Sequence, residues 1–289
     1  MRFEAPTSLG AAIELLENEA GVARVLAGGT DVLVQLRAGH VEPDLIVDIK
    51  RIEAMNLITA EDGGFRIGAA VCGAELGSHE GVCKMWPGVV EAVELIGSTQ
   101  IQGRATMVGN LCNASPAADS VPAMVAAGAT ARITGSTGTR DIAVENIATG
   151  PGKTSLTRAE LVESVFLPAR GTHAGDAYLR FIPRTEMDIA VVGAGVSIEM
   201  DDTGICTQAR VALGAVGPRV MLVDEAAGAL IGSSVDETAL ATLAAAASAA
   251  ATPIDDKRGT IDFRVKVAGV LARRAALAAL KRSQNQEVE

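Results

Sequence analysis

Amphipathic helical patterns alternate with short apolar runs along the first part of the chain. Apolar residues recur at helical spacing from Ser8 to Ala20, and the hydroxyl of Ser8 or Thr7 can accept a hydrogen bond from the free amides at the helix start. A second helix is expected over 32–38. Short apolar runs predict strands at 23–26, 45–49 and 65–67. This order predicts a small first α/β unit.

The middle of the chain shows helical spacing from about Ala74 to Gly97, with an apolar face that ends at Ile96. A turn-rich stretch of low charge follows at 103–120, and another helix is expected to begin near Pro122. Strand-like alternation then returns at 129–134 and 161–167.

The last part of the chain follows a linker predicted at 170–176. Two β-rich stretches, at 189–200 and 209–216, are separated by a turn at Gly204. Two Ala-rich helices, at 236–251 and 263–282, then close the chain ahead of a polar tail. Strands followed by helices are typical of a separate α+β domain.

Composition narrows the classes of function. Hydrophobic residues make up 48% of the chain but aromatic residues only 2%, so the cores must be built from Ala, Val, Leu and Ile. With a net charge of −10 and few aromatic side chains, the chain is not expected to bind nucleic acid or an anionic membrane surface. No apolar stretch approaches the roughly 20 residues of a spanning helix, and the first residues do not resemble a secretory signal. We therefore expect a cytoplasmic protein without membrane insertion.

Cysteines and histidines give no sign of a metal or catalytic site. The four cysteines are scattered without C-x-x-C spacing, which predicts free thiols. His40, His79 and His173 form no constellation with Ser or Asp. No metal ligand and no catalytic residue is predicted.

The first candidate site is the turn from Ala27 to Asp31, where a predicted strand ends in two glycines and a helix begins. Such a turn presents free backbone amides, and its glycines allow close approach, which suits a pyrophosphate. A purely steric role for the glycine pair is the alternative. The turn lacks the G-x-G-x-x-G spacing of the dinucleotide fingerprint.

The second candidate site is the polar stretch from Thr106 to Ser120, rich in hydroxyl and amide groups and closed by one carboxylate. It suits a ligand with phosphate at one end and a polyol at the other. Asp119 could accept hydrogen bonds from ribose or ribityl hydroxyls, or it could merely cap the helix that follows.

Together the two stretches resemble the FAD motifs of the xanthine dehydrogenase / carbon monoxide dehydrogenase family, specifically its medium, FAD-binding subunit. The resemblance is carried by 25–32, 106–110 and 113–119, and it extends over nearly the whole chain. It includes 263–271, which is close to the pattern Y/F-R-x-x-x-A-x-x-L. One position departs from the family: the second motif is usually T/S-x-G-G-N, and Val108 replaces the first of its two glycines.

The resemblance assigns roles to individual residues. It implies that the loop 25–32 wraps the FAD pyrophosphate, that 106–110 continues this contact, and that Asp119 binds the sugar portion. It also implies that Ile96 and Val162 make apolar contacts with the ring system or the adenine side. Arg180 falls where relatives have a basic residue near the flavin, ahead of a gating loop at 181–189. The predicted FAD-binding residues are Val25, Leu26, Ala27, Gly28, Gly29, Thr30, Asp31, Val32, Ile96, Thr106, Gly109, Asn110, Asn113, Ser115, Asp119, Val162 and Arg180. Neither motif places a His or Cys where FAD is tethered in covalent relatives, although Cys112 is near, so the FAD is expected to be noncovalent.

The resemblance also implies an α+β (α/β) chain with a vanillyl-alcohol-oxidase-type FAD-binding fold. The expected units are an N-terminal FAD-binding subdomain at 1–57, a second one at 58–172, and a C-terminal α+β domain of the CO dehydrogenase flavoprotein type at 176–285. The implied function is an FAD-binding electron-transfer subunit of a molybdenum hydroxylase. The expected partners are a molybdopterin-binding large subunit and a small subunit with [2Fe–2S] clusters, assembled as a dimer of heterotrimers, or heterohexamer. Electrons would leave through FAD to an external acceptor.

Two alternatives remain open. A self-sufficient FAD oxidoreductase of the same fold, such as an enolpyruvyl-sugar reductase, would need its own acid and base, for which only the isolated Glu186 and Asp188 stand out. A cofactor-free assembly protein is the other alternative, and Val108 is its only support.

Overall fold

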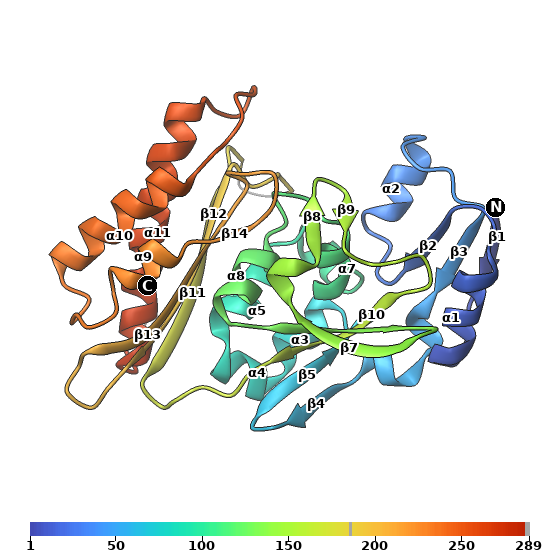
Figure 1. Ribbon diagram of the computed structural model, residues 1–289, viewed down its shortest axis with the longest axis horizontal. Coiled ribbons are helices and arrows are strands. Elements are labelled where there is room, and N and C mark those ends of the chain that lie inside the picture. The colour runs from blue at the N-terminus through green and yellow to red at the C-terminus, as the bar shows by residue number, and fades with distance from the viewer. Residues whose placement is uncertain (185–186, 287–289) are drawn as a thin grey trace.

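The computed structural model describes residues 1–184 and 187–286 and has three units arranged in chain order along its long axis (Figure 1). The first unit is a three-stranded parallel sheet in the order β1-β3-β2. Its elements are β1 (Arg2–Glu4), α1 (Leu9–Asn18), β2 (Ala23–Leu26), α2 (Val32–Arg37) and β3 (Leu45–Asp48), followed by two short 3₁₀ helices, η1 (Ile49–Arg51) and η2 (Glu53–Asn56). Ser8 caps α1 by accepting a hydrogen bond from the amide of Ala11, as predicted. Strand β1 was not predicted from the sequence.

The second unit is a five-stranded antiparallel sheet in the order β4-β5-β10-β6-β7. Its strands are β4 (Ile58–Glu61), β5 (Gly64–Gly68), β6 (Thr130–Gly135), β7 (Gly138–Ala143) and β10 (Leu161–Leu167), and a small hairpin, β8 (Ala148–Gly150) with β9 (Lys153–Thr154), follows the 3₁₀ helix η3 (Val144–Asn146). The strand predicted at 65–67 therefore exists, but its assignment to the first unit was wrong because β5 pairs with β4 and β10.

Six helices of the second unit lie between β5 and β6. They are α3 (Gly73–Ser78), α4 (Glu80–Met85), α5 (Pro87–Glu94), α6 (Thr99–Gln102), α7 (Met107–Cys112) and α8 (Ser120–Ala126). The helical pattern predicted from Ala74 to Gly97 is broken into three helices, because His79 caps α4 and Pro87 starts α5. The turn predicted over 103–120 was partly wrong, since α7 lies within it.

The third unit is a four-stranded antiparallel sheet covered by the C-terminal helices. Its elements are β11 (Ala174–Phe181), β12 (Val192–Met200), β13 (Cys206–Gly214), β14 (Met221–Leu222), α9 (Asp224–Gly228), α10 (Glu237–Ala250) and α11 (Ile261–Ser283). Helix α11 packs on β11 and β12, whereas α5 and α8 of the second unit contact the same sheet through β11, β12 and β13. The linker predicted at 170–176 was too long, because Ala174 to Asp176 already belong to β11 and Asp176 is only 3% exposed.

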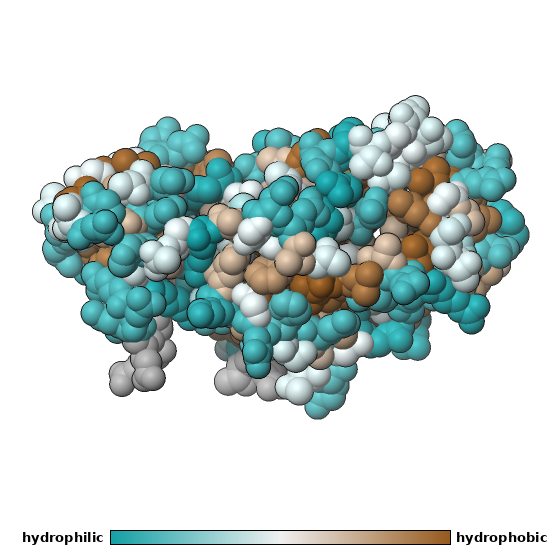
Figure 2. Space-filling model, turned by 90° about the horizontal axis from the view of Figure 1, so that it is seen from below, coloured by the Kyte–Doolittle hydropathy of each residue, from teal (hydrophilic) through white to brown (hydrophobic). Residues whose placement is uncertain are grey.

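The division into units at 1–57, 58–172 and 176–285 remains a prediction. Hydrophobic side chains form two buried clusters: one is shared by the first and second units and includes Tyr178, Ala212 and Val220 of the third, and the other lies within the third unit. Among the described residues, no helix is long and apolar enough to span a membrane. Seen from below, the surface is mostly hydrophilic, with apolar side chains gathered near its middle and toward the N-terminal end (Figure 2).

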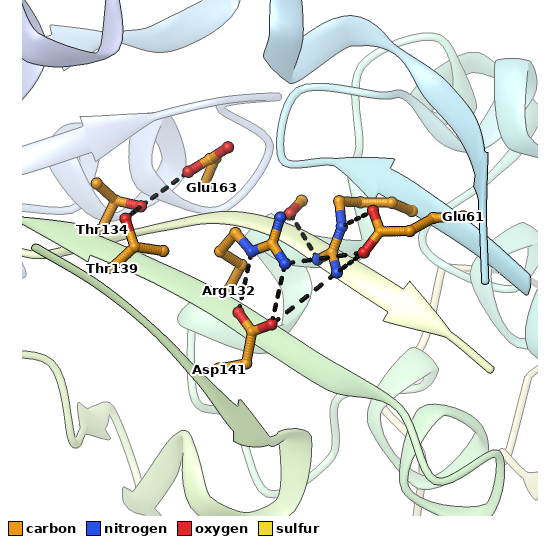
Figure 3. Close-up of polar contacts among 8 residues, drawn as sticks. Glu61, Arg132, Thr134, Thr139, Asp141 and Glu163 are labelled. Atoms are coloured by element: carbon orange, nitrogen blue, oxygen red, sulfur yellow. Dashed lines mark hydrogen bonds and ion pairs between the residues drawn. The ribbon is translucent and has the colours of Figure 1, made fainter.

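A network of charged side chains covers one face of the second sheet (Figure 3). Glu61 accepts hydrogen bonds from Arg66, while Asp141 accepts from Arg132 at 3.0 Å. The hydroxyl of Thr134 donates to Glu163 at 2.8 Å. Hydrogen bonds to the arginines lower the pKa of Glu61 and of Asp141. The charged side chains of this network are thus paired with one another or with a hydroxyl group, and their pairing explains why charged residues occupy this face.

Candidate functional site

A cleft of about 410 Å³ lies where the first unit meets helix α7 and the β8–β9 hairpin. Its lining comes from the loop after β2, from α2, from the start of α7 and from the hairpin. The predicted FAD-binding residues in the lining are Val25, Ala27, Gly28, Gly29, Thr30, Asp31, Val32, Ile96, Thr106, Gly109, Asn110 and Asn113. The structure thus brings the two predicted loops together in one cleft, although they are far apart in the sequence.

The first loop packs directly against the backbone that precedes α7. A Cβ atom on Gly28 would lie only 1.9 Å from the carbonyl oxygen of Arg104, so no other residue fits there without displacing the loop. The next residue, Gly29, has φ of +81°, which residues with a side chain rarely adopt. The two glycines therefore serve both the close approach of the two loops and the turn itself.

The backbone amides of residues 28–32 donate to no acceptor among the residues that the structure describes. The carbonyl oxygens of this loop do have partners: those of Gly29 and Asp31 accept hydrogen bonds from backbone amides in α2. Consecutive free amides at the border of a cleft form an anion-binding concavity. This arrangement suits a pyrophosphate, and binding of the FAD pyrophosphate by this loop remains a prediction.

Helix α7 forms the opposite wall of the cleft. The side chain of Thr106 caps it by accepting from the amide of Gly109 at 2.8 Å. Asn110 Oδ1 accepts from the amide and the hydroxyl of Ser120, which ties α7 to α8. Asn113 Oδ1 accepts from Nε2 of Gln35 at 2.9 Å, which joins α7 to α2 across the cleft. The polar residues of the second motif therefore hold the walls of the cleft in place.

Val108, the departure from the family motif, does not line the cleft. Its side chain is 4% exposed and belongs to the hydrophobic cluster shared by the first and second units. It lies within α7, and its φ is not positive. The side chain of Val108 therefore forms no part of the cleft wall.

Asp119 lies outside the cleft lining, in a buried network between the second and third units. Its carboxylate accepts from the hydroxyl of Tyr178 at 2.9 Å and from Nη1 of Arg180 at 2.7 Å. It makes no capping hydrogen bond to α8, so the capping alternative was wrong. Burial raises the pKa of Asp119 to about 6, against the opposing influence of Arg180 and Tyr178. Its contact with the FAD sugar remains a prediction.

The other predicted residues outside the cleft lining are Leu26, Ser115, Val162 and Arg180. Leu26 and Val162 are 5% and 3% exposed, and Val162 belongs to the first hydrophobic cluster. Ser115 accepts from the amide of Ala117. Arg180 is committed to its ion pair with Asp119. Their contacts with FAD remain predictions.

Asp31 is the acidic side chain in the lining of the cleft. Burial raises its pKa. Asp31 is predicted as part of the phosphate-binding loop, but its carboxylate would repel a phosphate placed beside it. Its position instead suits a hydroxyl or amide donor of a ligand.

Several lining residues were not predicted as FAD-binding: Arg24, Gln35, His40, Val41, Ala105, Cys112, Gly152 and Thr154. Gly152 and Thr154 come from the β8–β9 hairpin, and nothing local in the sequence connects this hairpin with the motifs. All four cysteines are free thiols, as predicted. Burial raises the pKa of Cys112 to about 12, so its thiol stays protonated at neutral pH and is a weak nucleophile.

Asp188, which follows β11 in the chain, forms two ion pairs. Asp188 pairs with Arg184 at 3.2 Å and with Arg258, from the α10–α11 connection, at 3.6 Å. Glu186, named in the sequence analysis, lies outside the described residues. No group of His, Cys, Asp and Glu within the described residues could hold a metal ion.

The residues of the cleft fit FAD. The free amides and the glycines that allow close approach suit the pyrophosphate, Ile96 offers an apolar surface, and Asp31 can accept from a donor.

Comparisons with known proteins agree with this assignment. Residues 1–170 match the family of the FAD binding domain in molybdopterin dehydrogenase, and 177–279 match the CO dehydrogenase flavoprotein C-terminal domain. The chain is 30% identical to the carbon monoxide dehydrogenase medium chain of Afipia carboxidovorans, covering 98% of each. It is 29% identical to the nicotinate dehydrogenase FAD-subunit of Eubacterium barkeri, covering 83% of each.

A solved structure of carbon monoxide dehydrogenase from Hydrogenophaga pseudoflava matches with a TM-score of 0.93 at 29% identity, covering 98% of both chains. The expected fold, including its C-terminal domain of the CO dehydrogenase flavoprotein type, is confirmed.

Proposed function

Because the chain belongs to the family of FAD-binding medium subunits of molybdopterin dehydrogenases, we propose that it is the subunit through which electrons leave such an enzyme. It accepts them from a partner subunit that holds [2Fe–2S] clusters and passes them to an external acceptor. Oxidation of the organic substrate takes place on a molybdopterin-binding partner.

The observation that carries this proposal is the row of amides at 28–32, which donate to no acceptor among the described residues and belong to residues that line one cleft together with the second motif. FAD, when bound, supplies the electron-transfer chemistry, while the protein supplies binding and orientation. The amides of the first loop bind the pyrophosphate, and Ile96 packs against the ring system or the adenine. The high pKa of Cys112 and its protonated thiol support noncovalent FAD.

The relatives support the assignment of the substrate to another chain. One is named as the FAD-subunit of a nicotinate dehydrogenase and another as the medium chain of a carbon monoxide dehydrogenase. Chains of this kind therefore belong to dehydrogenases named for chemically unlike substrates. In this proposal the chain assembles with a large and a small subunit into a heterotrimer, two heterotrimers form a dimer, and the complex is cytoplasmic.

Within the part of the chain that the structure describes, the site supports neither of the two alternative functions. For a self-sufficient oxidoreductase, Asp188 is paired with Arg184 and Arg258 and does not line the cleft. For a cofactor-free assembly protein, Val108 was the only argument, and it packs in the core rather than in the cleft.

The visible absorption spectrum of the purified full chain tests the proposal. We expect one FAD per chain, released into the supernatant by acid precipitation, and negligible turnover of small organic substrates without partner subunits. A colourless protein that takes up no added FAD would refute the proposed function. Flavin that remains in the acid pellet would refute noncovalent binding alone.

A further inference from the structure

Lys50 lies behind the first loop, in the 3₁₀ helix η1 that follows β3, and is not part of the cleft lining. Its Nζ atom donates a hydrogen bond to the carbonyl oxygen of Ala27 at 3.0 Å. The same atom is 2.7 Å from Oδ1 of Asp48, which also accepts from the amide of Lys50. Asp48 thus holds the ammonium group in position against the loop.

The contact with Ala27 determines which way the next amide points. In a trans peptide the carbonyl and the N–H point in opposite directions, and the described residues contain no cis peptide bond. The peptide whose carbonyl faces Lys50 ends in the N–H of Gly28. This amide therefore points away from Lys50, and it is one of the amides without an acceptor.

The following peptide is held in the same way. The carbonyl oxygen of Gly28 accepts a longer hydrogen bond from Nε of Arg104, at 3.4 Å, so the amide of Gly29 points away from Arg104. Two consecutive carbonyls, of Ala27 and Gly28, thus accept from cationic side chains that do not line the cleft. The N–H groups of the same two peptides, on Gly28 and Gly29, donate to no acceptor among the described residues.

Such anchoring matters because the loop contains two adjacent glycines. Without a Cβ atom, a glycine peptide can rotate between orientations that other residues do not reach. Rotation of the peptide between Ala27 and Gly28 would turn a carbonyl oxygen, instead of an amide, toward a phosphate. A hydrogen bond from a charged donor opposes that rotation.

We propose that Lys50 is a positioning residue for the cofactor: by binding the carbonyl of Ala27, it orients the amide of Gly28 toward the FAD pyrophosphate and sets the affinity for FAD. This inference rests on the proposed function and extends it to a residue outside both motifs. Lys50 does not touch the cofactor itself.

The test compares Lys50→Met with Lys50→Arg and with a control, Lys84→Met on the surface of α4, in the full chain freed of flavin. FAD is titrated back, and binding is followed by flavin fluorescence. Loss of one charge-assisted hydrogen bond predicts FAD binding about tenfold weaker in Lys50→Met. Lys50→Arg should restore most of the affinity, and Lys84→Met should bind as the wild type does.

Two further measurements separate positioning from other roles of Lys50. The Tm of the flavin-free protein should be nearly the same in Lys50→Met and wild type; if it falls, Lys50→Gln serves as the second variant. The difference in affinity should persist at 1 M salt, where the Debye length is about 3 Å, because a contact hydrogen bond is screened far less than attraction at a distance.

Unchanged FAD affinity in Lys50→Met, or a difference that vanishes at 1 M salt, overturns the positioning role while the proposed function stands. If the wild-type chain itself takes up no FAD, the proposed function fails first and this inference fails with it.

Discussion

The carboxylate of Asp119 and the guanidinium of Arg180 form a buried ion pair, with 2.7 Å between Oδ2 and Nη1, that joins the helical part of the second unit to strand β11 of the third. Their side chains are 10% and 6% exposed, and the Tyr178 hydroxyl completes the contact. A residue expected to bind a sugar thus also connects two units of the fold.

Replacing Asp119 with Ala tests both roles. The change leaves the Tyr178 hydroxyl and Arg180 without their acceptor, so we expect the free energy of unfolding to fall by on the order of 2 kcal/mol. If the carboxylate also contacts the FAD sugar, FAD affinity should fall roughly tenfold to a hundredfold. Denaturant titration and FAD titration of the same variant measure the two quantities, with the exposed Asp202→Ala as the control. Lost stability with unchanged FAD affinity would leave Asp119 a purely structural residue.

The raised pKa of Asp119 predicts a specific pH dependence. Its pKa of about 6 in the folded chain lies above the ordinary value of 3.8, so the folded state holds this proton more tightly than the unfolded state does. The stability that protonation of Asp119 adds is therefore complete below about pH 4 and is lost as the pH rises through about 6, while the contacts with Tyr178 and Arg180 remain. Asp119→Asn imitates the protonated form. Its free energy of unfolding, relative to that of the wild type, should therefore rise by on the order of 2 kcal/mol between these pH values. Unfolding free energies measured at pH 4.5, 5.5 and 7 check this, and a difference independent of pH would contradict it.

Gly28→Ala should abolish or greatly weaken FAD retention. The added Cβ atom meets the carbonyl oxygen of Arg104, so the first loop must move away from the residues before α7. We expect at least a tenfold loss of affinity, equivalent to about 1.4 kcal/mol, and a larger loss for Gly28→Val. The ratio of FAD to protein after gel filtration is the measurement. Gly103→Ala is the matched control, because a Cβ atom there meets nothing within 4 Å. Full FAD occupancy in Gly28→Val would remove the first loop from the phosphate site.

Val108→Gly restores the glycine of the family motif but should lower stability without improving FAD binding. The substitution removes a buried side chain and places glycine within a helix, which together cost about 3 kcal/mol. FAD affinity should stay within about twofold, because Val108 packs in the core and not in the cleft. Thermal unfolding of the flavin-free chain and FAD titration give the two numbers. Clearly tighter FAD binding in this variant would show that Val108 restricts the site.

Arg184→Ala addresses the segment after β11 that is expected to control access of the acceptor. The Arg184 side chain is 69% exposed and pairs with Asp188, so its loss should change stability by less than about 0.5 kcal/mol. In the assembled complex we expect a changed rate of flavin reoxidation and an unchanged rate of cluster reduction by substrate. Stopped-flow absorbance follows both rates. Unchanged reoxidation with every acceptor tried would exclude Arg184 from this role.

Local patterns in the sequence were sufficient for the longer elements and for the two loops of the site. Helices α10 and α11 and strand β10 were predicted nearly to their ends, because each carries a long apolar pattern of one period. Strands β1 and β7 were missed, since short or exposed strands gain most of their stability from pairing with distant neighbours. The glycines of the first loop and the capping Thr106 could be recognised because turn and cap chemistry depends on adjacent residues.

The sequence by itself determined the family, the cofactor and the two loops, because each depends on residue types at short, defined spacings. Only the tertiary structure decided that Val108 faces the core, that Asp119 is committed to Tyr178 and Arg180, and that Lys50 holds the carbonyl of Ala27. Only the tertiary structure, likewise, places the β8–β9 hairpin at the cleft. These relationships join residues that lie far apart along the chain, and their energies depend on burial and on orientation to within a few tenths of an ångström. No local pattern records such distances, so they arise only when the three sheets pack together.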